Sequence, residues 1–499
     1  MRLAILTLIV FINKSFLFAQ DYNILDFGAV NDGKTLNTPA IQSAIDAAFK
    51  NGKGRVVIPE GVFLTGSIIL KSNVELNLND KALLLGSTNS GDYIKLNRWK
   101  AIIMADGQKN IAITGQGKID GQGRRLALNI DSLFYIGQID SANYDFAYRR
   151  PKEPARPQLI EFVNCENIRV KNVTLSNASC WVQTYDQCSN VILDSVRVNS
   201  DAYWNNDGFD IQDCHNVRIT NCTVNSADDG ISLKSQSANN DCDSIYISDC
   251  SIRSSGSAIK FGTVSHGGFK NVTVENIEIH DTFRSAVAIE CVDGGVLENI
   301  LVNHVDAVNT GNAIFIRLGE RTKTQSFGEI KNVTIKNMKV QVPFGRPDSA
   351  YKMQGPLVLF PHNTFPSSIT GIPGRRVENV TLENIEISYP GKGDSSIANI
   401  PLSRLNEVPE KIADYPEFSM FGELPAWGFY VRHIDGLTMK NIKVSIEAAD
   451  YRPAFIFDDA RNLNLYSLTI DGDQKDKKII LRQTENAKVV DKKSVLRLH

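Results

Sequence analysis

The sequence predicts an all-β chain that forms a right-handed parallel β-helix, a solenoid whose amino-terminal end is capped by a short helix. A repeat with steps of 23 to 28 residues occupies the central part of the chain. Each repeat holds short alternations of apolar and polar residues rich in Val, Ile and Thr, the pattern of half-buried strands. Gly, Asn, Asp and Ser separate the alternations, as turns require.

The repeat opens with Asn or Ser, followed by an apolar, a variable and a second apolar residue. It begins at Asn167, Asn190, Asn216, Ser244, Asn271, Asn299, Asn332, Asn379 and Asn462. From Asn167 to Asn299 the steps are 23, 26, 28, 27 and 28 residues, and we interpret one step as one coil. A β-propeller is the alternative, but propeller repeats are longer, about 40 residues or more, with four strands each.

The amino-terminal end needs a cap because a solenoid otherwise leaves its core open. Within a cap of about residues 21–66, one segment has the pattern of an amphipathic helix. Thr38 is the expected N-cap and Pro39 the first helical residue. The face expected to cover the core consists of Ile41, Ala44, Ile45 and Ala48.

The later repeats are longer, which predicts loops that leave the regular coils. The step after Asn332 is 47 residues, and the long excursions are expected at about residues 344–373 and 389–427. Loops on a rigid scaffold commonly carry recognition. We interpret residues 21–499 as a single β-helix domain.

Residues 1–20 have the pattern of a signal peptide. Arg2 precedes an apolar stretch, and the small residue Ala19 marks the expected cleavage region. An amino-terminal anchor helix is the alternative, although Asn13 to Ser15 interrupt a segment already shorter than a span of about 20 residues. No later segment has the composition of a membrane span. We therefore expect a periplasmic or secreted protein.

The composition argues against nucleic acid as a partner. The formal net charge is -2, and both signs are scattered along the chain without a basic stripe. Hydrophobic residues make up 42% of the chain, enough for a large core. We expect a monomer.

All eight cysteines lie between Cys165 and Cys291. Several recur at equivalent places in successive repeats, which predicts a buried ladder of thiols packed as small hydrophobic groups. Disulfides are the alternative, since an exported chain permits them.

Three aspartates gather at one place in the repeat. Asp207 and Asp229 are 22 residues apart, close to one coil, and Asp228 adjoins Asp229. We expect the three carboxyl groups to meet on one face, where mutual repulsion raises at least one pKa. Glycoside hydrolysis requires such a pair of an acid and a carboxylate. The alternatives are that Asp-Gly pairs only form turns, or that the oxygens bind calcium.

With these residues the chain resembles glycoside hydrolase family 28, the polygalacturonase family of pectin-degrading β-helix enzymes. The family's Asn-Thr-Asp motif is similar to Asn205-Asn206-Asp207, and its Asp-Asp motif to Asp228-Asp229. Further similar segments are Asp26 to Val30, Gly54 to Pro59, Thr65 to Ser67 and Gly115 to Gly123.

The resemblance implies an inverting hydrolysis without metal or other cofactor. Asp228 would be the general acid, and Asp207 with Asp229 would hold and deprotonate the attacking water. Inverting enzymes separate their carboxyl groups by about 6.5–9.5 Å to accommodate that water.

Two departures from the family pattern concern the substrate. The Gly-His-Gly motif corresponds to Gly256 to Ala258, so Ser257 replaces the histidine, and His266 is either a substitute that leans toward the site or a loop residue. The Arg-Ile-Lys motif that grips a galacturonate carboxylate corresponds to Ala288 to Glu290. An ionised Glu290 would repel a uronate there.

Other cations are therefore candidates for binding an anionic sugar. They are Lys234, Lys260, Arg284 and Arg317, each of which has the alternative of a solvated surface charge. Trp204, three residues before Asp207, is the aromatic residue expected to stack on sugar, whereas Trp181 is expected to pack in the core or anchor a loop. Arg432 and His433 follow the late excursion and are possible substrate contacts.

The function that the sequence favours is hydrolysis of a pectin-like acidic polysaccharide or its oligosaccharides. A rhamnogalacturonan or other non-galacturonan glycosidase, a polysaccharide lyase and a non-catalytic carbohydrate-binding β-helix are the alternatives. The lyase lacks an evident basic residue beside the aspartates, and the retained aspartates disfavour the binding protein.

Overall fold

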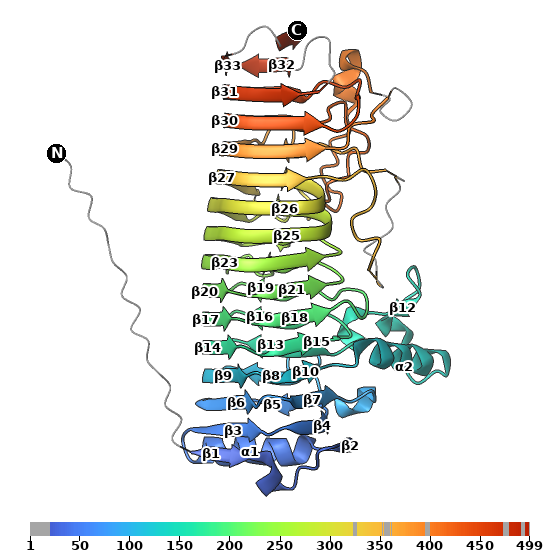
Figure 1. The fold of residues 1–499 in the computed structure, drawn as a ribbon, viewed down its shortest axis with the longest axis vertical. Coiled ribbons are helices and arrows are strands. Elements are labelled where there is room, and N and C mark those ends of the chain that lie inside the picture. The colour runs from blue at the N-terminus through green and yellow to red at the C-terminus, as the bar shows by residue number, and fades with distance from the viewer. Residues whose placement is uncertain are drawn as a thin grey trace, which may run out of the picture.

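A computed structural model describes residues 20–322, 327–351, 353, 360, 362–394, 400–472, 479–490 and 495–498. Strands stack in parallel along one axis from the amino-terminal to the carboxyl-terminal end (Figure 1). The stack confirms the predicted right-handed parallel β-helix. Residues 1–19, which include most of the expected signal peptide, lie outside the described residues.

Each coil contributes strands to three parallel sheets. The first sheet contains β1 (Asp21–Asn23), β3 (Gly54–Ile58), β6 (Val74–Leu78), β9 (Lys109–Gly115), β14 (Glu166–Lys171), β17 (Ser189–Asp194) and β20 (His215–Thr220). The second contains β2 (Asp32–Leu36), β4 (Gly61–Thr65), β7 (Ala82–Gly86), β10 (Lys118–Asp120), β15 (Thr174–Ser176), β18 (Arg197–Ser200) and β21 (Thr223–Ser226). The third, which we call the site sheet, contains β5 (Ile68–Ile69), β8 (Ala101–Asp106), β13 (Gln158–Val163), β16 (Gln183–Asp186), β19 (Phe209–Gln212), β22 (Ile231–Ser235), β24 (Ile259–Ser265), β28 (Ser367–Thr370), β32 (Ile479–Glu485) and β34 (Val495–Leu498).

In the later coils one long strand bends through two or three of these sheets. These strands are β23 (Cys242–Ser254), β25 (Gly268–Cys291), β26 (Val296–Leu318), β27 (Glu329–Gln341), β29 (Val377–Tyr389), β30 (Phe429–Ile446) and β31 (Phe455–Asp471), beside the short β33 (Lys488–Val489). The ends of β25, β26, β30 and β31 continue the site sheet.

The repeated asparagine forms a left-handed turn at the start of most first-sheet strands. Asn167, Asn190 and Asn216 have φ of 59°, 55° and 57°, in the left-handed region that asparagine tolerates. Their side chains also bond along the stack: the Asn190 amide donates to Asn167 at 3.1 Å, and that of Asn216 to Asn190 at 2.6 Å. The sequence period therefore equals the structural coil.

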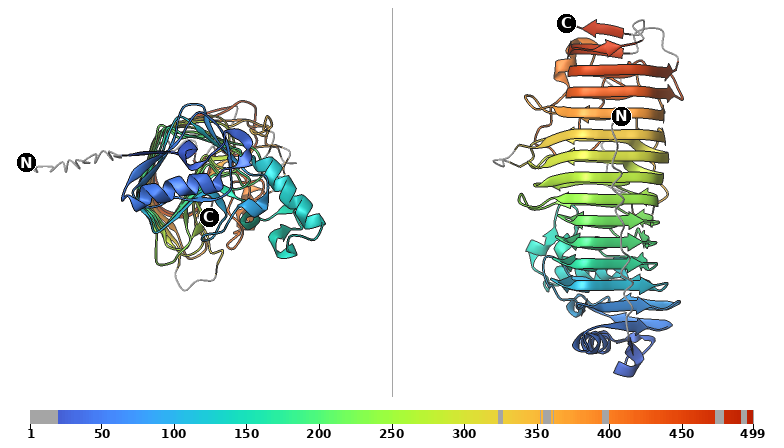
Figure 2. Two further views of the ribbon diagram at one scale, coloured as in Figure 1. Left: turned by 90° about the horizontal axis from the view of Figure 1, so that it is seen from below. Right: turned by 90° about the vertical axis from the view of Figure 1, so that its left-hand side faces the viewer.

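The predicted cap is helix α1 (Thr38–Lys50), which lies across the amino-terminal opening of the solenoid (Figure 2). The predicted face of Ile41, Ala44, Ile45 and Ala48 is buried. The expected N-cap was wrong by one residue, since Asn37 holds that position without a side-chain cap bond. Thr38 instead accepts a hydrogen bond from the Gly66 backbone N–H at 2.7 Å, which ties the helix to the next turn.

The excursions leave the stack mainly on one side, where helix α2 (Gly123–Tyr135) and the late loops project in Figure 1. A small antiparallel pair, β11 (Tyr144–Asp145) and β12 (Arg150–Pro151), follows α2. The expected excursion at 344–373 contains β28, so residues 367–370 belong to the site sheet, where they pair with β26 and β30. The excursion at 389–427 fits between the end of β29 and the start of β30.

Short 3₁₀ helices complete the described elements. They are η1 (Ile24–Phe27), η2 (Ser90–Asp92), η3 (Ser141–Asn143), η4 (Glu153–Ala155) and η5 (Leu402–Glu407). None of the described helices has both the length and the hydropathy that a membrane crossing demands.

All eight cysteines are free thiols with buried side chains, so the disulfide alternative is wrong. Cys188, Cys214 and their neighbours stack along the core: the Cys188 backbone N–H donates to Cys214 Sγ at 3.3 Å. Burial raises the pKa of Cys188, which keeps its thiol protonated and unreactive.

We predict that the folded protein shows no reactive thiol in a titration with a thiol-specific reagent, whereas denaturation without reductant releases all eight. The physical reason is burial of every sulfur in the core. Fewer than eight thiols after denaturation would reveal a disulfide and contradict the ladder.

Candidate active site

The pairing of β19 with β22 places two of the predicted aspartates side by side. Phe209 pairs with Ile231, and Asp207 and Asp229 each lie two residues before these partners. Both side chains are buried, with 4% and 3% exposed, whereas the adjacent Asp228 is partly exposed. The register brings Asp207 beside Asp229, and the carboxyl group of Asp228 is close enough for the charges of both to raise its pKa.

The glycine after each aspartate permits neighbouring coils to approach closely. A Cβ on Gly208 would lie 2.5 Å from the Gly230 carbonyl oxygen, and one on Gly230 would lie 2.7 Å from that of Ala258. Neither glycine has a positive φ. The Asp-Gly pairs therefore serve close stacking, and the alternative that they only form turns does not account for them.

Asp229 is held as a carboxylate. Its Oδ2 accepts a hydrogen bond from Lys260 Nζ at 2.9 Å, and its Oδ1 accepts from the Ser257 backbone N–H at 2.8 Å. Burial alone would raise the pKa of Asp229, but the charges of Lys260 and Arg284 outweigh it and lower that pKa. Asp229 is therefore suited to act as a base.

Asp228 has the opposite environment. Within the described residues its carboxyl group makes no ion pair, and its Oδ1 accepts only the Asp229 backbone N–H, at 3.1 Å. Burial, together with the charges of Asp207 and Asp229, raises the pKa of Asp228 to about 7. Adjacent carboxyl groups with pKa values moved apart are the usual sign of an acid and a base.

Asp207 shares a lysine with Asp210, a residue that sequence reasoning did not single out. Lys234 Nζ donates to Asp207 Oδ2 at 3.0 Å and also to Asp210. Burial raises the pKa of Asp207, and both carboxyl groups raise that of Lys234, which stays charged. The two-residue alternation of β19 could have revealed Asp210, because it places this residue on the same outward face as Gln212.

Two cations and two loop residues complete the group around Asp228 and Asp229. Lys260 Nζ also donates to the Tyr415 hydroxyl at 3.2 Å, and Arg284 pairs with Glu417 at 3.4 Å. Tyr415 and Glu417 come from the excursion at 389–427, about 130 to 155 residues along the chain, so no local pattern identified them.

The surface-charge alternative for the four candidate cations is wrong. Lys234, Lys260, Arg284 and Arg317 are 7%, 3%, 7% and 1% exposed. The first three surround the aspartates, whereas Arg317 does not contact them.

Glu290 lies on this face, but it does not have to be a charge. Its Oε2 accepts a hydrogen bond from Thr263 Oγ1 at 3.0 Å, and burial raises its pKa to about 7. Below that pH Glu290 carries a proton, so the repulsion of a uronate expected from the sequence is absent there.

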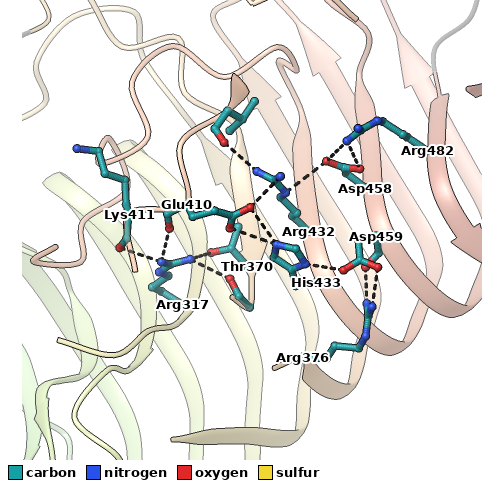
Figure 3. A network of polar contacts seen from close by, with 12 residues as sticks. Arg317, Thr370, Arg376, Glu410, Lys411, Arg432, His433, Asp458, Asp459 and Arg482 are labelled. Carbon is teal, nitrogen blue, oxygen red and sulfur yellow. Dashed lines mark hydrogen bonds and ion pairs between the residues drawn. The ribbon is translucent and has the colours of Figure 1, made fainter. Parts of the chain in front are cut away.

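Arg317 instead anchors the late excursion to the coils (Figure 3). Its guanidinium donates to the carbonyl oxygens of Glu410, Lys411 and Gly371, at 2.6, 3.0 and 3.0 Å, and to Thr370 at 3.3 Å. These bonds engage both terminal nitrogens of the guanidinium, so Arg317 positions the loop that carries Tyr415 and Glu417.

Arg432 and His433 belong to the same anchoring network, as Figure 3 shows. Arg432 donates to the Val408 carbonyl oxygen at 2.9 Å and pairs with Glu410 at 2.8 Å. The His433 ring lies between Glu410 and Asp459, with contacts of 3.1 and 2.6 Å. Both side chains therefore help to hold the late excursion against the coils.

His266, Trp204 and Trp181 lie outside the group of aspartates and cations. His266 follows the last residue of β24, at the opposite end of that strand from Ser257, and none of the described hydrogen bonds involves its ring. Trp204 is 37% exposed, and the Arg150 guanidinium lies 5.3 Å from its ring. Trp181, expected in the core or as a loop anchor, is half-buried under Lys234, whose Nζ is 4.3 Å from its ring.

Within the described ranges, no three His, Cys, Asp or Glu side chains gather in a way that could hold a metal ion. The oxygens of Asp207, Asp210 and Asp229 instead face lysine ammonium groups. The arrangement offers a protonated acid, an ionised base and fixed cations, which suits acid–base chemistry on an anionic or polyhydroxy substrate.

Comparison with known proteins identifies similar chains. The family model of glycosyl hydrolases family 28 matches residues 50–408. A probable polygalacturonase from Vitis vinifera is 23% identical over 74% of this chain and 70% of its own length. An exo-poly-alpha-D-galacturonosidase from Dickeya chrysanthemi is 24% identical over 73% of this chain and 71% of its own. The structure of a family 28 exopolygalacturonase from Yersinia enterocolitica has a TM-score of 0.61 with 21% identity, over 94% of this chain and 78% of that one, and so shares the fold.

We predict that Arg317→Ala lowers the free energy of unfolding by about 2–4 kcal/mol and exposes residues 400–427 to protease, because buried carbonyl groups lose their donor. Urea denaturation and limited proteolysis measure the two effects. Arg461→Ala, which removes the exposed pair with Glu485, is the matched control and should change neither. A stable Arg317 variant with an unchanged cleavage pattern would refute the anchoring role.

Proposed function

The chain belongs to family 28 of the glycosyl hydrolases, and from this we propose that it hydrolyses a glycosidic bond beside a uronate in a pectin-like polysaccharide or oligosaccharide. It is a glycoside hydrolase by family. The observation that carries the proposal is the contrast between the adjacent Asp229, which accepts hydrogen bonds from Lys260 and the Ser257 backbone N–H, and Asp228, which makes no ion pair with the described residues and whose pKa is raised.

Asp228 donates its proton to the leaving glycosidic oxygen, which its raised pKa permits near neutral pH. Asp229 and Asp207 hold a water on the other side of the anomeric carbon, and Asp229, whose pKa is lowered by Lys260 and Arg284, accepts the proton of that water as it attacks. Lys234 stabilises the negative charge on Asp207. Inversion follows because water attacks directly and no covalent sugar intermediate forms.

The uronate carboxylate binds Lys260 and Arg284, which supply the positive charge absent from Ala288 and Glu290. Lys260 is the in-register neighbour of Ala288 on the adjacent strand. Its positive charge therefore lies one coil away from Ala288, the position where the sequence lacks a cation. The planar guanidinium of Arg284 is suited to binding a carboxylate. When substrate binds, the uronate carboxylate replaces Glu417 as the partner of Arg284. The names of the relatives, polygalacturonase and exo-poly-alpha-D-galacturonosidase, support a galacturonate at this position.

We also propose that residues 1–20 export the chain to the periplasm or medium, where such polymers occur.

We predict that the purified chain produces new reducing ends from galacturonan or rhamnogalacturonan without ultraviolet absorbance from an unsaturated product. Asp228→Asn, Asp207→Asn and Asp229→Asn should each lower kcat by about 10²–10⁴-fold. Asp249→Asn, an exposed aspartate outside the site sheet, is the control and should retain activity. Absorbance from the product would indicate a lyase, and equal activity of all variants would exclude the aspartates from catalysis.

We predict a bell-shaped dependence of kcat/KM on pH. The rate falls as pH rises through about 7, because Asp228 then loses its proton. The rate also falls at acid pH, where Asp229 becomes protonated, and this limb lies at a pH below the ordinary pKa of an aspartate. Lys260→Met should move the acidic limb to higher pH, since burial then raises the pKa of Asp229 unopposed by that charge. The surface variant Lys440→Met should leave both limbs in place, and an unmoved acidic limb in Lys260→Met would contradict the assignment.

A further inference from the structure

The charged residues on the outer face of the site sheet differ in sign on the two sides of the aspartates Asp207 and Asp229. On the carboxyl-terminal side stand the buried cations Lys260 and Arg284. On the amino-terminal side, the same outward positions hold Glu161 on β13 and Asp186 on β16. Lys234, the cation between the two sides, is already bound by Asp207 and Asp210.

The amino-terminal side also contains buried polar atoms without partners among the described residues. Gln212 is 0% exposed, and neither its Oε1 nor its Nε2 makes a hydrogen bond. Glu161 Oε2, Asp186 Oδ1 and Trp99 Nε1 are likewise unpaired. Each such group costs about 1–3 kcal/mol, so a cluster of them needs a reason beyond folding.

Two tryptophans lie next to residues of this side: the Trp99 backbone N–H donates to Glu161 Oε1 at 2.8 Å, and Trp181 lies 4.3 Å from the Nζ of Lys234, the in-register neighbour of Gln212. The rings of Trp99 and Trp181 are 4.9 Å apart and meet edge to face, and Trp181 is half-buried next to Lys234. Apolar ring surface with a few placed donors and acceptors is the usual composition of a small-molecule site.

The chemistry favours an uncharged polyhydroxy ligand. A hydroxyl group both donates and accepts, so it can pair with the Gln212 amide and with the Glu161 and Asp186 oxygens. A uronate carboxylate only accepts, and its burial needs a cation. The remaining nearby cations, Lys95 and Arg98, are exposed, and Arg98 lies over the Trp99 ring at 4.9 Å.

We propose that Trp181, Gln212, Glu161 and Asp186 form a subsite for an uncharged sugar on the amino-terminal side of the catalytic aspartates. The subsite rests on the proposed function and specifies its substrate: the cleaved bond joins an uncharged sugar to a uronate, the latter held by Lys260 and Arg284. Gln212 and Glu161 select the substrate and take no part in proton transfer.

The test compares two oligosaccharides of equal length, one alternating rhamnose and galacturonate and the other made of galacturonate alone. Binding is measured by calorimetry with the inactive Asp228→Asn chain, and kcat and KM with the active chain. We expect the alternating oligosaccharide to bind about tenfold or more tightly. Gln212→Leu should weaken its binding about tenfold with kcat unchanged, because lost hydrogen bonds to the bound sugar act in the ground state as well.

Gln212→Lys should shift preference toward the galacturonate oligosaccharide by about 10-fold or more, since it adds the missing cation. Gln483→Lys, at an exposed position on β32, is the matched control and should shift nothing. Lys260→Met should weaken binding of both oligosaccharides, because both place a uronate on the carboxyl-terminal side.

Tighter binding of pure galacturonate by the unmodified chain, or equal effects of Gln212→Leu on both ligands, would overturn the subsite. Circular dichroism checks that the Gln212→Lys variant is folded. If it is not folded, the binding measurements on Gln212→Leu decide whether the subsite exists. Binding without cleavage of either ligand would instead reject the proposed hydrolysis while leaving the subsite supported.

Discussion

The left-handed turn that most coils make at an asparagine is the constraint on which the rest of the structure depends. It fixes where these first-sheet strands begin, and its side chain commonly bonds to the equivalent asparagine of the neighbouring coil, as Asn216 does with Asn190. Because the turn recurs at the same point, the side chains of successive coils stand in register for the length of the stack. A slip of one residue would turn every outward side chain of the site sheet into the core. The geometry of the candidate site is thus a consequence of a backbone conformation that asparagine tolerates and most residues do not.

Register alone would place three like charges together at a high cost in free energy. The chain separates them by environment: Lys260 and a backbone N–H keep Asp229 ionised, and Lys234 faces Asp207. Asp228 makes no ion pair with the described residues, and its raised pKa lets it keep its proton up to about pH 7. Burial strengthens each of these effects because water does not screen the charges. The same fixed charges that make the cluster tolerable also divide the roles of acid and base.

The late excursion extends this arrangement beyond the coils. Arg317, Arg432 and His433 hold its backbone against the site sheet, and Tyr415 and Glu417 then reach the two cations beside the aspartates. Glu417 neutralises the charge of Arg284, and the Tyr415 hydroxyl accepts a hydrogen bond from Lys260. A loop held at its base can exchange such contacts for those of a ligand without losing its place.

The period of the asparagines, the apolar face of the cap and the 22-residue interval between Asp207 and Asp229 were enough to predict the fold and the neighbouring positions of these two aspartates from the sequence, because a solenoid converts sequence distance directly into spatial neighbourhood. The cap boundary was wrong by one residue since Asn37 and Thr38 both suit a helix start, and their bonds to distant turns decide between them.

Only the tertiary structure decided the role of each cation. Lys234, Lys260, Arg284 and Arg317 are alike in sequence, yet three surround the aspartates and the fourth binds loop carbonyls. It also decided the protonation of Glu290 and the contacts of Tyr415, because burial and long-range loop packing depend on the whole fold and leave no periodic trace in the chain.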